Sequence, residues 1–527
     1  IGKAYFLSEA HPDSIVNGTG TIEYLALVDY RWNEEFELPF EGTLPYTIAS
    51  PVAAGIEYDL ITEGPQAPPI TTNTIFTANK VARFTPLVNN NATLTLNDGV
   101  RVDMYNSTIT IEAGSHLVLG NNVIIRGRKG INKLVINGFV QTGNHVSFIA
   151  EQGATLEVVY NNPLVTNTLS HCIFFNADLT VQAGIIYIEQ TQLSFNASNN
   201  VTIHPYGRLM LDSCLLTKSG TSLWKGIQVL GTPNQQQVSP FTYQGYLGVI
   251  NGTIIEYAEI GVSVGIDGQP LTYGGILKAN NVIFRNNLIS VAVLPYTYAN
   301  LTTLQECAFV LDAILPGGRY PQYMVVFNQV TTPWVKACSF LNNVTAYTSV
   351  VGVASNCGLV CSGVCDNPSA NPCPSYTYAK FENLYRGVNI YGQAGSTVDI
   401  SHTWFKNNRR GLYLSGLTAS TIVQNIFELP SAYITNDTVY GCYLDHCTGY
   451  LVTENTFSYT GSNNARTVGL YVKHSNLNAA TASNEIYNNT FGGLYCGSIA
   501  YGRNRYSTTA GLCYKCNDFS GSNHDIV

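Results

Sequence analysis

From about residue 226 onward, hydrophobic and polar positions follow a short phrase: a glycine, an aliphatic residue, a variable residue and a second aliphatic residue. Successive side chains of a strand point to opposite faces, so the two aliphatic residues share one face and the variable residue lies on the other. The phrase begins at Gly226, Gly261, Gly387, Gly411, Gly441 and Gly469. The last four begin 24, 30 and 28 residues apart. A repeat of about 20 to 30 residues with one strand per copy predicts a solenoid of the parallel β-helix type.

A second phrase, an asparagine-rich turn beside an aromatic residue, recurs in the same region. It spans residues 284–287, 340–343, 405–408, 455–457 and 489–491. Asparagine favours tight turns, and equivalent residues of neighbouring β-helix rungs lie about 4.8 Å apart. We therefore expect the corner asparagines to stack, with each side-chain amide bonding to the next.

A variant of the repeat precedes these phrases, between about residues 76 and 225. Each copy is a strand, a corner that carries a glycine, and a strand with alternating apolar residues, as in Leu117 and Leu119. The corner glycines are Gly114, Gly153, Gly184 and Gly207. We expect them to supply a positive φ where the chain turns sharply between sheets, because glycine adopts that conformation without steric cost.

These patterns predict an all-β chain, a right-handed parallel β-helix solenoid with loop insertions, whose hand follows from the rule for parallel crossovers. Residues 1–75 lack the repeat and include a Pro-rich stretch, so we expect a capping or small β segment with a linker. Residues 76–225 would form regular rungs with glycine corners, and residues 226–527 Asn-rich rungs with insertions, including a Cys-rich loop at 356–377. We expect the β-helix to continue beyond the C-terminus, because the last residues still carry the repeat.

The repeats resemble those of known β-helix proteins. The glycine and Asn-x-Phe phrases look like the rungs of pectate-lyase-like proteins. Segments 207–214 and 224–229 are similar to a phrase of large secreted β-helix proteins exported by the bacterial type IX pathway. The resemblance covers about residues 76–527. It implies a right-handed parallel β-helix in a secreted or cell-surface protein, with an extracellular location.

Charge and hydropathy argue against two classes of function. Only 11% of residues are charged and the net charge is −8. Basic residues gather only in small groups, so we expect no binding to nucleic acid through phosphate neutralisation. No apolar run approaches the length of about 18 residues that a membrane span needs, so we expect none. No motif indicates a cofactor.

The chain has 13 cysteines, and Cys357, Cys361, Cys365 and Cys373 crowd into one segment rich in Gly, Ser, Asn and Pro. We interpret this segment as an inserted loop stapled by disulfides, which fits an oxidising, extracellular setting. Free thiols and a zinc site are the alternatives. Structural zinc favours ligand pairs about two to four residues apart, so we expect no metal site. Cys442 occupies an aliphatic slot of the glycine phrase and is interpreted as a small core residue.

The sequence lacks the constellation that a polysaccharide-cleaving β-helix needs. Hydrolysis requires paired carboxylates, and elimination requires acidic residues around calcium with a basic residue. The nearest candidates are Asp399 with His402, and Asp445 and His446 with Lys473 and His474. The second set occupies matching slots of successive phrases and predicts a surface ion-pair ladder, which stabilises little; an acid/base or metal-binding patch is the alternative. We expect no enzymatic activity; a β-helix lyase or glycoside hydrolase with its acids on inserted loops is the alternative.

The variable slot of the glycine phrase is rich in aromatic residues. On four consecutive recognisable repeats this slot holds Asn389, Tyr413, Tyr443 and Tyr471. Outward, stacked tyrosines would form a binding platform, because each offers a flat apolar face and a hydroxyl to a sugar ring or a protein partner. Aromatic pairing that stabilises the sheet, or cover by a long loop, is the alternative.

Together these features predict a secreted or cell-surface structural or adhesive β-helix protein. It would act as a stalk, adhesin or filament subunit that presents outward aromatic residues and loops. Its partner would be a polysaccharide or a cell-surface protein. End-to-end self-association is a further expectation, because exposed sheet ends invite pairing.

Overall fold

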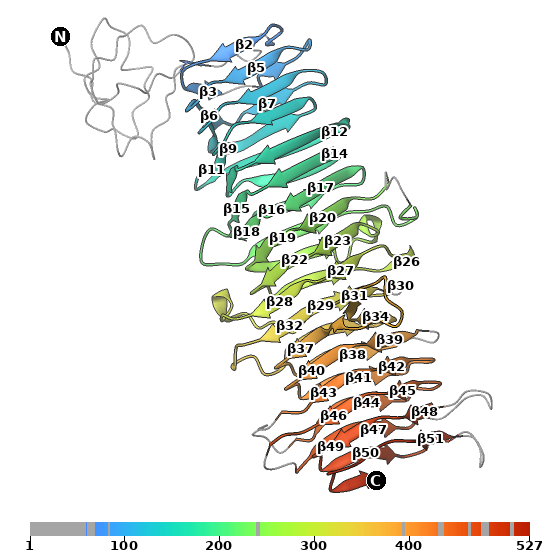
Figure 1. The fold of residues 1–527 in the computed structure, drawn as a ribbon. Helices are drawn as coiled ribbons and strands as arrows, with labels where there is room; N and C mark the ends of the chain where they lie inside the picture. Colours follow the sequence, from blue (N-terminus) through green and yellow to red (C-terminus); the bar gives the residue numbers. More distant parts are fainter. Residues whose placement is uncertain are drawn as a thin grey trace, which may run out of the picture. The chain divides into compact units, whose positions relative to one another are not determined.

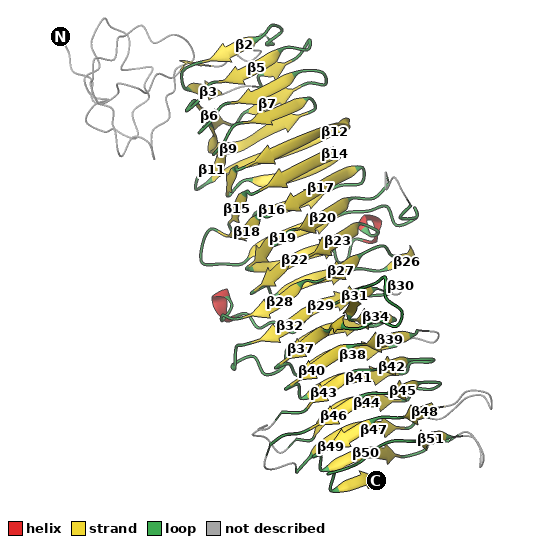
Figure 2. Ribbon diagram, in the orientation of Figure 1, coloured by secondary structure: helices red, strands yellow, loops and turns green. Residues whose placement is uncertain are grey.

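The computed structural model describes residues 59–60, 69–82, 85–238, 243–331, 333–392, 396–430, 437–461, 465–475, 484–505 and 511–527. In these ranges strands dominate, and the helical segments are two 3₁₀ turns, η3 (Pro270–Thr272) and η4 (Pro316–Gly318) (Figure 2). Strands pair in parallel from rung to rung, so the predicted all-β parallel β-helix is confirmed. The chain forms two compact units, residues 1–179 and 180–527. Most of the predicted segment 1–75 lies outside the described residues.

In the first unit, three strips of parallel strands make up the rungs (Figure 1). One strip contains β1 (Asp59–Leu60), β3 (Lys80–Ala82), β6 (Arg101–Tyr105), the start of β9 (Ile124–Ile136), β11 (Ser147–Ala150) and β13 (Ile173–Phe175). A second contains β4 (Leu87–Val88), β7 (Thr108–Ile111), the end of β9 and β12 (Ala154–Ser170). The third contains β2 (Thr74–Phe76), β5 (Thr93–Leu96), β8 (His116–Leu119) and β10 (Phe139–Thr142). Their buried residues are mostly aliphatic and alternate with outward polar residues, which gives this unit an aliphatic core.

The second unit also has three strips, which we name by their content (Figure 1). The phenylalanine strip contains β15 (Gln192–Phe195), β18 (Leu215–Lys218), β21 (Ile254–Glu256), β24 (Ile283–Arg285), β28 (Ala308–Leu311), β32 (Ser339–Asn342), β37 (Ala379–Glu382), β40 (Thr403–Lys406), β43 (Ile426–Glu428), β46 (Thr456–Ser458) and β49 (Thr490–Gly492). The glycine strip contains β16 (Asn200–Ile203), β19 (Trp224–Val229), β22 (Ala258–Val264), β25 (Ile289–Val293), β29 (Tyr323–Phe327), β33 (Val351–Ser355), β38 (Arg386–Tyr391), β41 (Arg410–Ser415), β44 (Val439–Asp445), β47 (Thr467–Lys473), β50 (Cys496–Tyr501) and β52 (His524–Ile526).

The third strip contains β14 (Asp178–Glu189), β17 (Gly207–Asp212), β20 (Tyr246–Ile250), β23 (Ile276–Asn280), β27 (Thr303–Gln305), β31 (Trp334–Lys336), β34 (Leu359–Ser362), β39 (Val398–Ser401), β42 (Thr421–Val423), β45 (Leu451–Thr453), β48 (Asn484–Tyr487) and β51 (Leu512–Lys515). Two small pairs lie outside the strips: β26 (Tyr296–Ala299) with β30 (Val330–Thr331), and β35 (Val364–Cys365) with β36 (Tyr376–Thr377). The second pair is antiparallel and belongs to the Cys-rich loop.

A continuous stack of phenylalanine rings fills the interior of the second unit. Consecutive rings lie 4.5–5.2 Å apart between centroids and within 13° of parallel. The stack consists of Phe284, Phe309, Phe340, Phe381, Phe405, Phe427, Phe457, Phe491 and Phe519. The aromatic residues of the second phrase therefore form one ladder in the core.

Four glycines of the first phrase, Gly387, Gly411, Gly441 and Gly469, face this stack, whereas Gly226 and Gly261 meet backbone carbonyls of the next rung. A Cβ on Gly411 would lie 2.9 Å from Cδ1 of Phe427 and 2.7 Å from the carbonyl oxygen of Gly441, both closer than real Cβ atoms come. The equivalent glycines on β38, β44 and β47 meet the next rings and carbonyls in the same way. The two sequence phrases are thus two halves of one contact, in which glycine leaves room for a ring in the neighbouring strip.

The predicted asparagine ladder is present from Asn425 to Asn517, and Asn425, Asn455 and Asn489 are buried. At the earlier corners Asn287 and Asn408 donate to backbone carbonyls instead. The Nδ2 group of Asn425 donates to Oδ1 of Asn455 at 2.9 Å, and the same bond links Asn455 to Asn489 and Asn489 to Asn517. Each of these amides also donates to a backbone carbonyl, as Asn425 does to Ile400 at 2.9 Å. In this ladder each rung thus satisfies the polar corner of the rung before it, which is why these polar side chains are tolerated inside.

The prediction that the corner glycines have a positive φ is confirmed at three of four positions. Gly114, Gly153 and Gly184 have φ of 83°, 81° and 90°. The prediction is wrong for Gly207, where the left-handed residue is Tyr206 with φ of 72°. Gly207 is needed for close approach instead, because a Cβ there would overlap the carbonyl oxygen of Val181.

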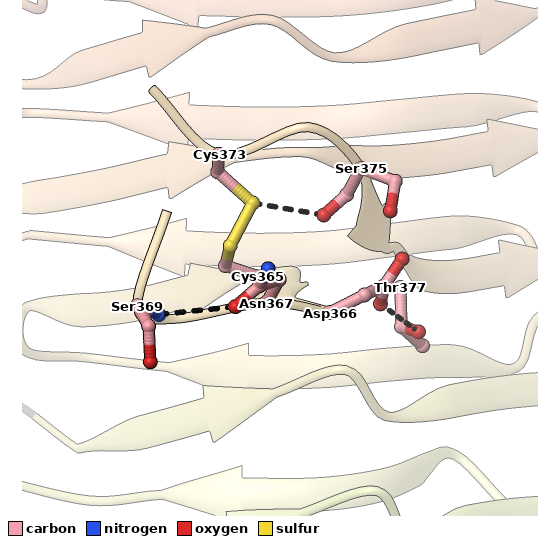
Figure 3. The surroundings of a disulfide bond; sticks show 7 residues. All are labelled: Cys365, Asp366, Asn367, Ser369, Cys373, Ser375 and Thr377. Atoms are coloured by element: carbon pink, nitrogen blue, oxygen red, sulfur yellow. Dashed lines mark hydrogen bonds between the residues drawn. A yellow bond between two sulfur atoms is a disulfide. The ribbon is translucent and has the colours of Figure 1, made fainter. Parts of the chain in front are cut away.

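The Cys-rich loop contains one disulfide, between Cys365 and Cys373 (Figure 3). Next to it, the hydroxyl of Thr377 donates to Asp366 at 2.8 Å, so the two sides of the loop are tied by a side-chain bond as well. The disulfide prediction is wrong for Cys357 and Cys361, which are free and buried. They lie where the chain re-enters the third strip, and Cys361 pairs in register with core residues of neighbouring strands, so these thiols serve as small core side chains.

Candidate functional site

The outward slot of the glycine strip places the predicted binding residues side by side. Asn389 on β38 pairs in register with Tyr413 on β41, which pairs with Tyr443 on β44 and then with Tyr471 on β47. Their alternate neighbours, such as Val388 and Leu412, are completely buried. The alternation of the phrase therefore fixes which face these side chains occupy.

The three tyrosine rings stack on one another. Ring centroids are 5.0 Å apart between Tyr413 and Tyr443 and 4.7 Å between Tyr443 and Tyr471, with interplanar angles of 25° and 17°. Tyr440 packs edge-on against Tyr443 at 5.1 Å and Tyr471 at 5.3 Å. The ring faces are consequently turned toward each other, and the ladder offers solvent its ring edges and hydroxyls. This geometry differs from the flat platform that the sequence led us to expect, because side chains in register one rung apart meet face to face.

None of the hydroxyls of Tyr413, Tyr443 and Tyr471 bonds to a residue in the described part of the chain. Burial raises the pKa of all three phenols, and for Tyr443 the nearby Asp445 carboxylate is the next cause. They are therefore protonated at any physiological pH and can both donate and accept hydrogen bonds. The result is a row of phenol hydroxyls, one per rung, at the rung spacing of about 4.8 Å.

Asn389 continues the ladder in register but is only 7% exposed. An Nη1 group of Arg386 donates to Oδ1 of Asn389 at 2.7 Å and to the hydroxyl of Tyr391 at 3.1 Å. Asn389 therefore holds an arginine in place and has little surface of its own.

Two arginines that sequence reasoning missed lie beside the tyrosines. Arg386 and Arg410 are in register on β38 and β41. The guanidinium carbon of Arg386 lies 4.4 Å from the ring centroid of Tyr413. That of Arg410 lies 5.6–5.8 Å from the rings of Tyr385, Tyr413, Tyr440 and Tyr443. Such contacts of a cation with ring faces and edges hold the guanidinium groups without neutralising them.

The sequence did carry a signal for these arginines. In both phrases an arginine directly precedes the glycine, as Arg386-Gly387 and Arg410-Gly411, 24 residues apart. We name the surface formed by Arg386, Arg410, Tyr413, Tyr443 and Tyr471 the arginine–tyrosine face.

The remaining predicted candidates form a separate ion-pair group. Asp445 lies 2.6 Å from Nδ1 of His446 and 3.6 Å from Nζ of Lys473, its partner in register. The rings of His446 and His474 lie 5.3 Å apart. This is the surface ladder that the sequence suggests, with Asp445 already occupied by two partners.

Asp399 and His402 lie in different surroundings. Asp399 is exposed on β39, whereas His402 stacks on Tyr376 of the Cys-rich loop with centroids 3.6 Å apart. Burial lowers the pKa of His402. The histidine thus docks the disulfide loop against the rung, which is a structural role.

Neither a metal-binding cluster nor a membrane-spanning helix occurs among the described residues. In these ranges, no group of three or more His, Cys, Asp or Glu side chains could hold a metal ion. Within the same part of the chain, no helix has the length and apolarity to cross a membrane.

Comparison with known proteins agrees with a β-helix. Residues 366–523, less than half of the chain, match the model of a family described as periplasmic copper-binding protein (NosD), a family of right-handed parallel β-helices. The residues described in this span lack a cluster that fits copper, so the match is not extended to that metal. No curated protein matches the chain in sequence.

Two solved structures are similar at low scores. A tailspike protein of Escherichia coli bacteriophage HK620, in complex with a pentasaccharide, has a TM-score of 0.32 and 11% identity, with 75% of this chain and 72% of that chain covered. The Dettilon tailspike protein has a TM-score of 0.28 and 10% identity, with 84% and 73% covered. At these scores the likeness is too distant to bear on function.

Proposed function

We propose that this parallel β-helix protein is an exported binding protein that holds a linear polysaccharide along the arginine–tyrosine face, without cleaving it. The observation that carries the proposal is the row of three phenol hydroxyls, one per rung, that bond to no residue in the described ranges. A row of equally spaced donors and acceptors suits a ligand that is itself extended and repetitive, and sugar hydroxyls are matching partners for phenols.

The absence of cleavage is argued from the carboxylates of the glycine strip between β38 and β50. Glycoside hydrolysis needs two, one as acid and one as base or nucleophile. The strands of this stretch carry Asp445, which is engaged by His446 and Lys473. A face with one occupied carboxylate favours binding over catalysis.

Export is proposed from two features. A disulfide in an inserted loop suits an oxidising compartment. The sequence resemblance to secreted and cell-surface β-helix proteins points the same way, with the type IX route, an adhesive role and end-to-end assembly as finer predictions. Light scattering of the full chain over a range of concentrations tests the last of these.

The decisive experiment is a glycan array with the purified chain, run beside assays for reducing ends and unsaturated products on the same polysaccharides. The variant to compare carries Tyr413→Phe, Tyr443→Phe and Tyr471→Phe, which keeps the stack and removes only the hydroxyls. We expect the triple variant to lose at least about tenfold in affinity, because each lost hydrogen bond contributes about 0.5–1.5 kcal/mol.

Tyr187→Phe, an exposed tyrosine on the third strip, is the matched control and should leave binding unchanged. Unchanged binding by the triple variant would show that the tyrosine hydroxyls are not part of the binding site. Release of product would overturn the non-catalytic proposal and move the search for carboxylates to the inserted loops.

A further inference from the structure

The two arginines of the arginine–tyrosine face differ from other arginines of the chain because they lack a carboxylate partner among the described residues. The side chain of Arg410 makes no hydrogen bond or ion pair with any described residue, and the side chain of Arg386 bonds only to the neutral Asn389 and Tyr391 within the same ranges. The Nε groups of both arginines are buried without a partner among these residues. Two cations on adjacent rungs thus have no carboxylate partner among the described residues.

Several other arginines of the chain have a carboxylate partner. The pairs are Arg126 with Asp103 and Glu151, Arg128 with Glu151, Arg285 with Glu256, Arg319 with Glu259 and Arg409 with Asp437. Arg409 is directly next to Arg410 in sequence, so the local backbone does not prevent pairing. The lack of a counter-ion sets Arg386 and Arg410 apart from these arginines.

The segments of the second half that the structure leaves undescribed do not supply the missing charge. Residues 332, 393–395, 431–436, 462–464, 476–483 and 506–510 contain no Asp or Glu. Asp445, the carboxylate in register with Ser415 on the same strip, is engaged by His446 and Lys473.

Two like charges in register repel each other, and cation–π contacts do not cancel that repulsion. An anion placed between the two guanidinium groups would cancel this repulsion. A guanidinium presents a planar fork of donors that fits an oxyanion with two bonds at once, and partial burial strengthens such bonds.

We propose that Arg386 and Arg410 form a binding site for an oxyanion, a carboxylate or sulfate group carried by the bound polymer. The polymer itself rests on the function proposed above, whereas the anion site can be tested without it. The site therefore selects acidic over neutral polysaccharides, with the tyrosine hydroxyls contacting the sugar hydroxyls beyond the anion.

The test uses the full chain and one polymer backbone in three charge states: dextran, carboxymethyl dextran and dextran sulfate. Calorimetric titration at low and at physiological salt is repeated with Arg386→Gln, Arg410→Gln and the double variant. Arg409→Gln, which removes an arginine that already has its carboxylate, is the matched control. In parallel, the melting temperature is measured in sodium sulfate and in sodium chloride at equal ionic strength.

We expect an anionic form to bind at least about tenfold more tightly than dextran, an advantage that the double variant loses and Arg409→Gln keeps. The tighter of the two anionic forms tells carboxylate from sulfate. A second double variant, Arg386→Lys with Arg410→Lys, keeps both positive charges and removes the planar forks. It should recover part of the advantage, and it decides the matter where the Gln variants fail to fold.

Equal binding of all three polymers, unchanged in the double Gln variant, would overturn the anion site and leave the polysaccharide function standing. No polymer binding, with a sulfate-specific rise in melting temperature that the double Gln variant lacks, would keep the anion site and reject the polysaccharide. No response in either measurement would reject both.

Discussion

Two groups of arginines, one in each unit, have opposite surroundings. In the first, Arg126 lies between Asp103 on β6 and Glu151 after β11, with its Nε 2.7 Å from Asp103, and Asp103 is almost completely buried. In the second, Arg386 and Arg410 are stacked in register among tyrosines, with no carboxylate from any described residue. Where an arginine serves the fold, the neighbouring rung supplies its counter-ion. Where the rung supplies tyrosine hydroxyls instead, the cation is left for a ligand.

The cores differ as well. The first unit is filled mainly by aliphatic residues, and its described part has one stacked pair of buried rings, Phe148 and Phe174, at 4.7 Å. The second contains the continuous phenylalanine stack with a facing line of glycines. A glycine in a strand weakens it, so its repeated use here indicates that the ring contact outweighs the loss.

The largest expected effect is on that stack. Phe427→Ala should destabilise the second unit by about 3–5 kcal/mol, because it leaves a cavity between Phe405 and Phe457 where neither ring can collapse. Stability in a solenoid is close to a sum of rung and interface terms, so the loss should be local. Hydrogen exchange should show faster exchange in β40, β43 and β46, with the first unit unaffected. Equal loss of protection in both units would contradict this separation.

A similar loss is expected from the charged network of the first unit. Arg126→Gln should lower the free energy of unfolding by about 3 kcal/mol, because the buried Asp103 loses its shorter ion pair. Among the described residues, Asp103 then has only the ion pair with Arg101, at 3.3 Å. Urea unfolding of the variant measures the effect. A change below about 1 kcal/mol would show that this network, like exposed ion pairs, contributes little.

A smaller effect is expected at the asparagine ladder. Asn455→Ala removes the amide between Asn425 and Asn489 and leaves their buried groups unpaired, for a loss of about 1–3 kcal/mol. Asn455→Asp keeps the acceptor and removes the donor, so it should be worse than alanine at neutral pH, because a buried charge adds to the lost bonds. Thermal melting of the two variants gives the order.

The sequence predicts more of the fold than of the site, and the reason is visible in particular residues. Alternation around Gly411 places Leu412 inside and Tyr413 outside, and the repeat spacing puts Tyr413 beside Tyr443. The contact between Gly411 and the ring of Phe427 was missed, because it joins two strips and depends on three-dimensional rung geometry. The stacking of ring faces, the burial of Asn389 and the free thiols Cys357 and Cys361 also depend on packing that no periodicity encodes.

The smallest effect on stability is expected at Arg410. Arg410→Gln should change the free energy of unfolding by less than about 1 kcal/mol, because relief of repulsion from Arg386 offsets cation–π contacts of about 0.5–1 kcal/mol. The same substitution at Arg126 is expected to cost several times more, although both side chains are partly buried and both lie on sheet faces. Urea unfolding of the two variants under one set of conditions makes the comparison direct. A large loss at Arg410 would mean that this arginine holds the rungs together as Arg126 does, and an unpaired cation would then be no guide to a binding site in this fold.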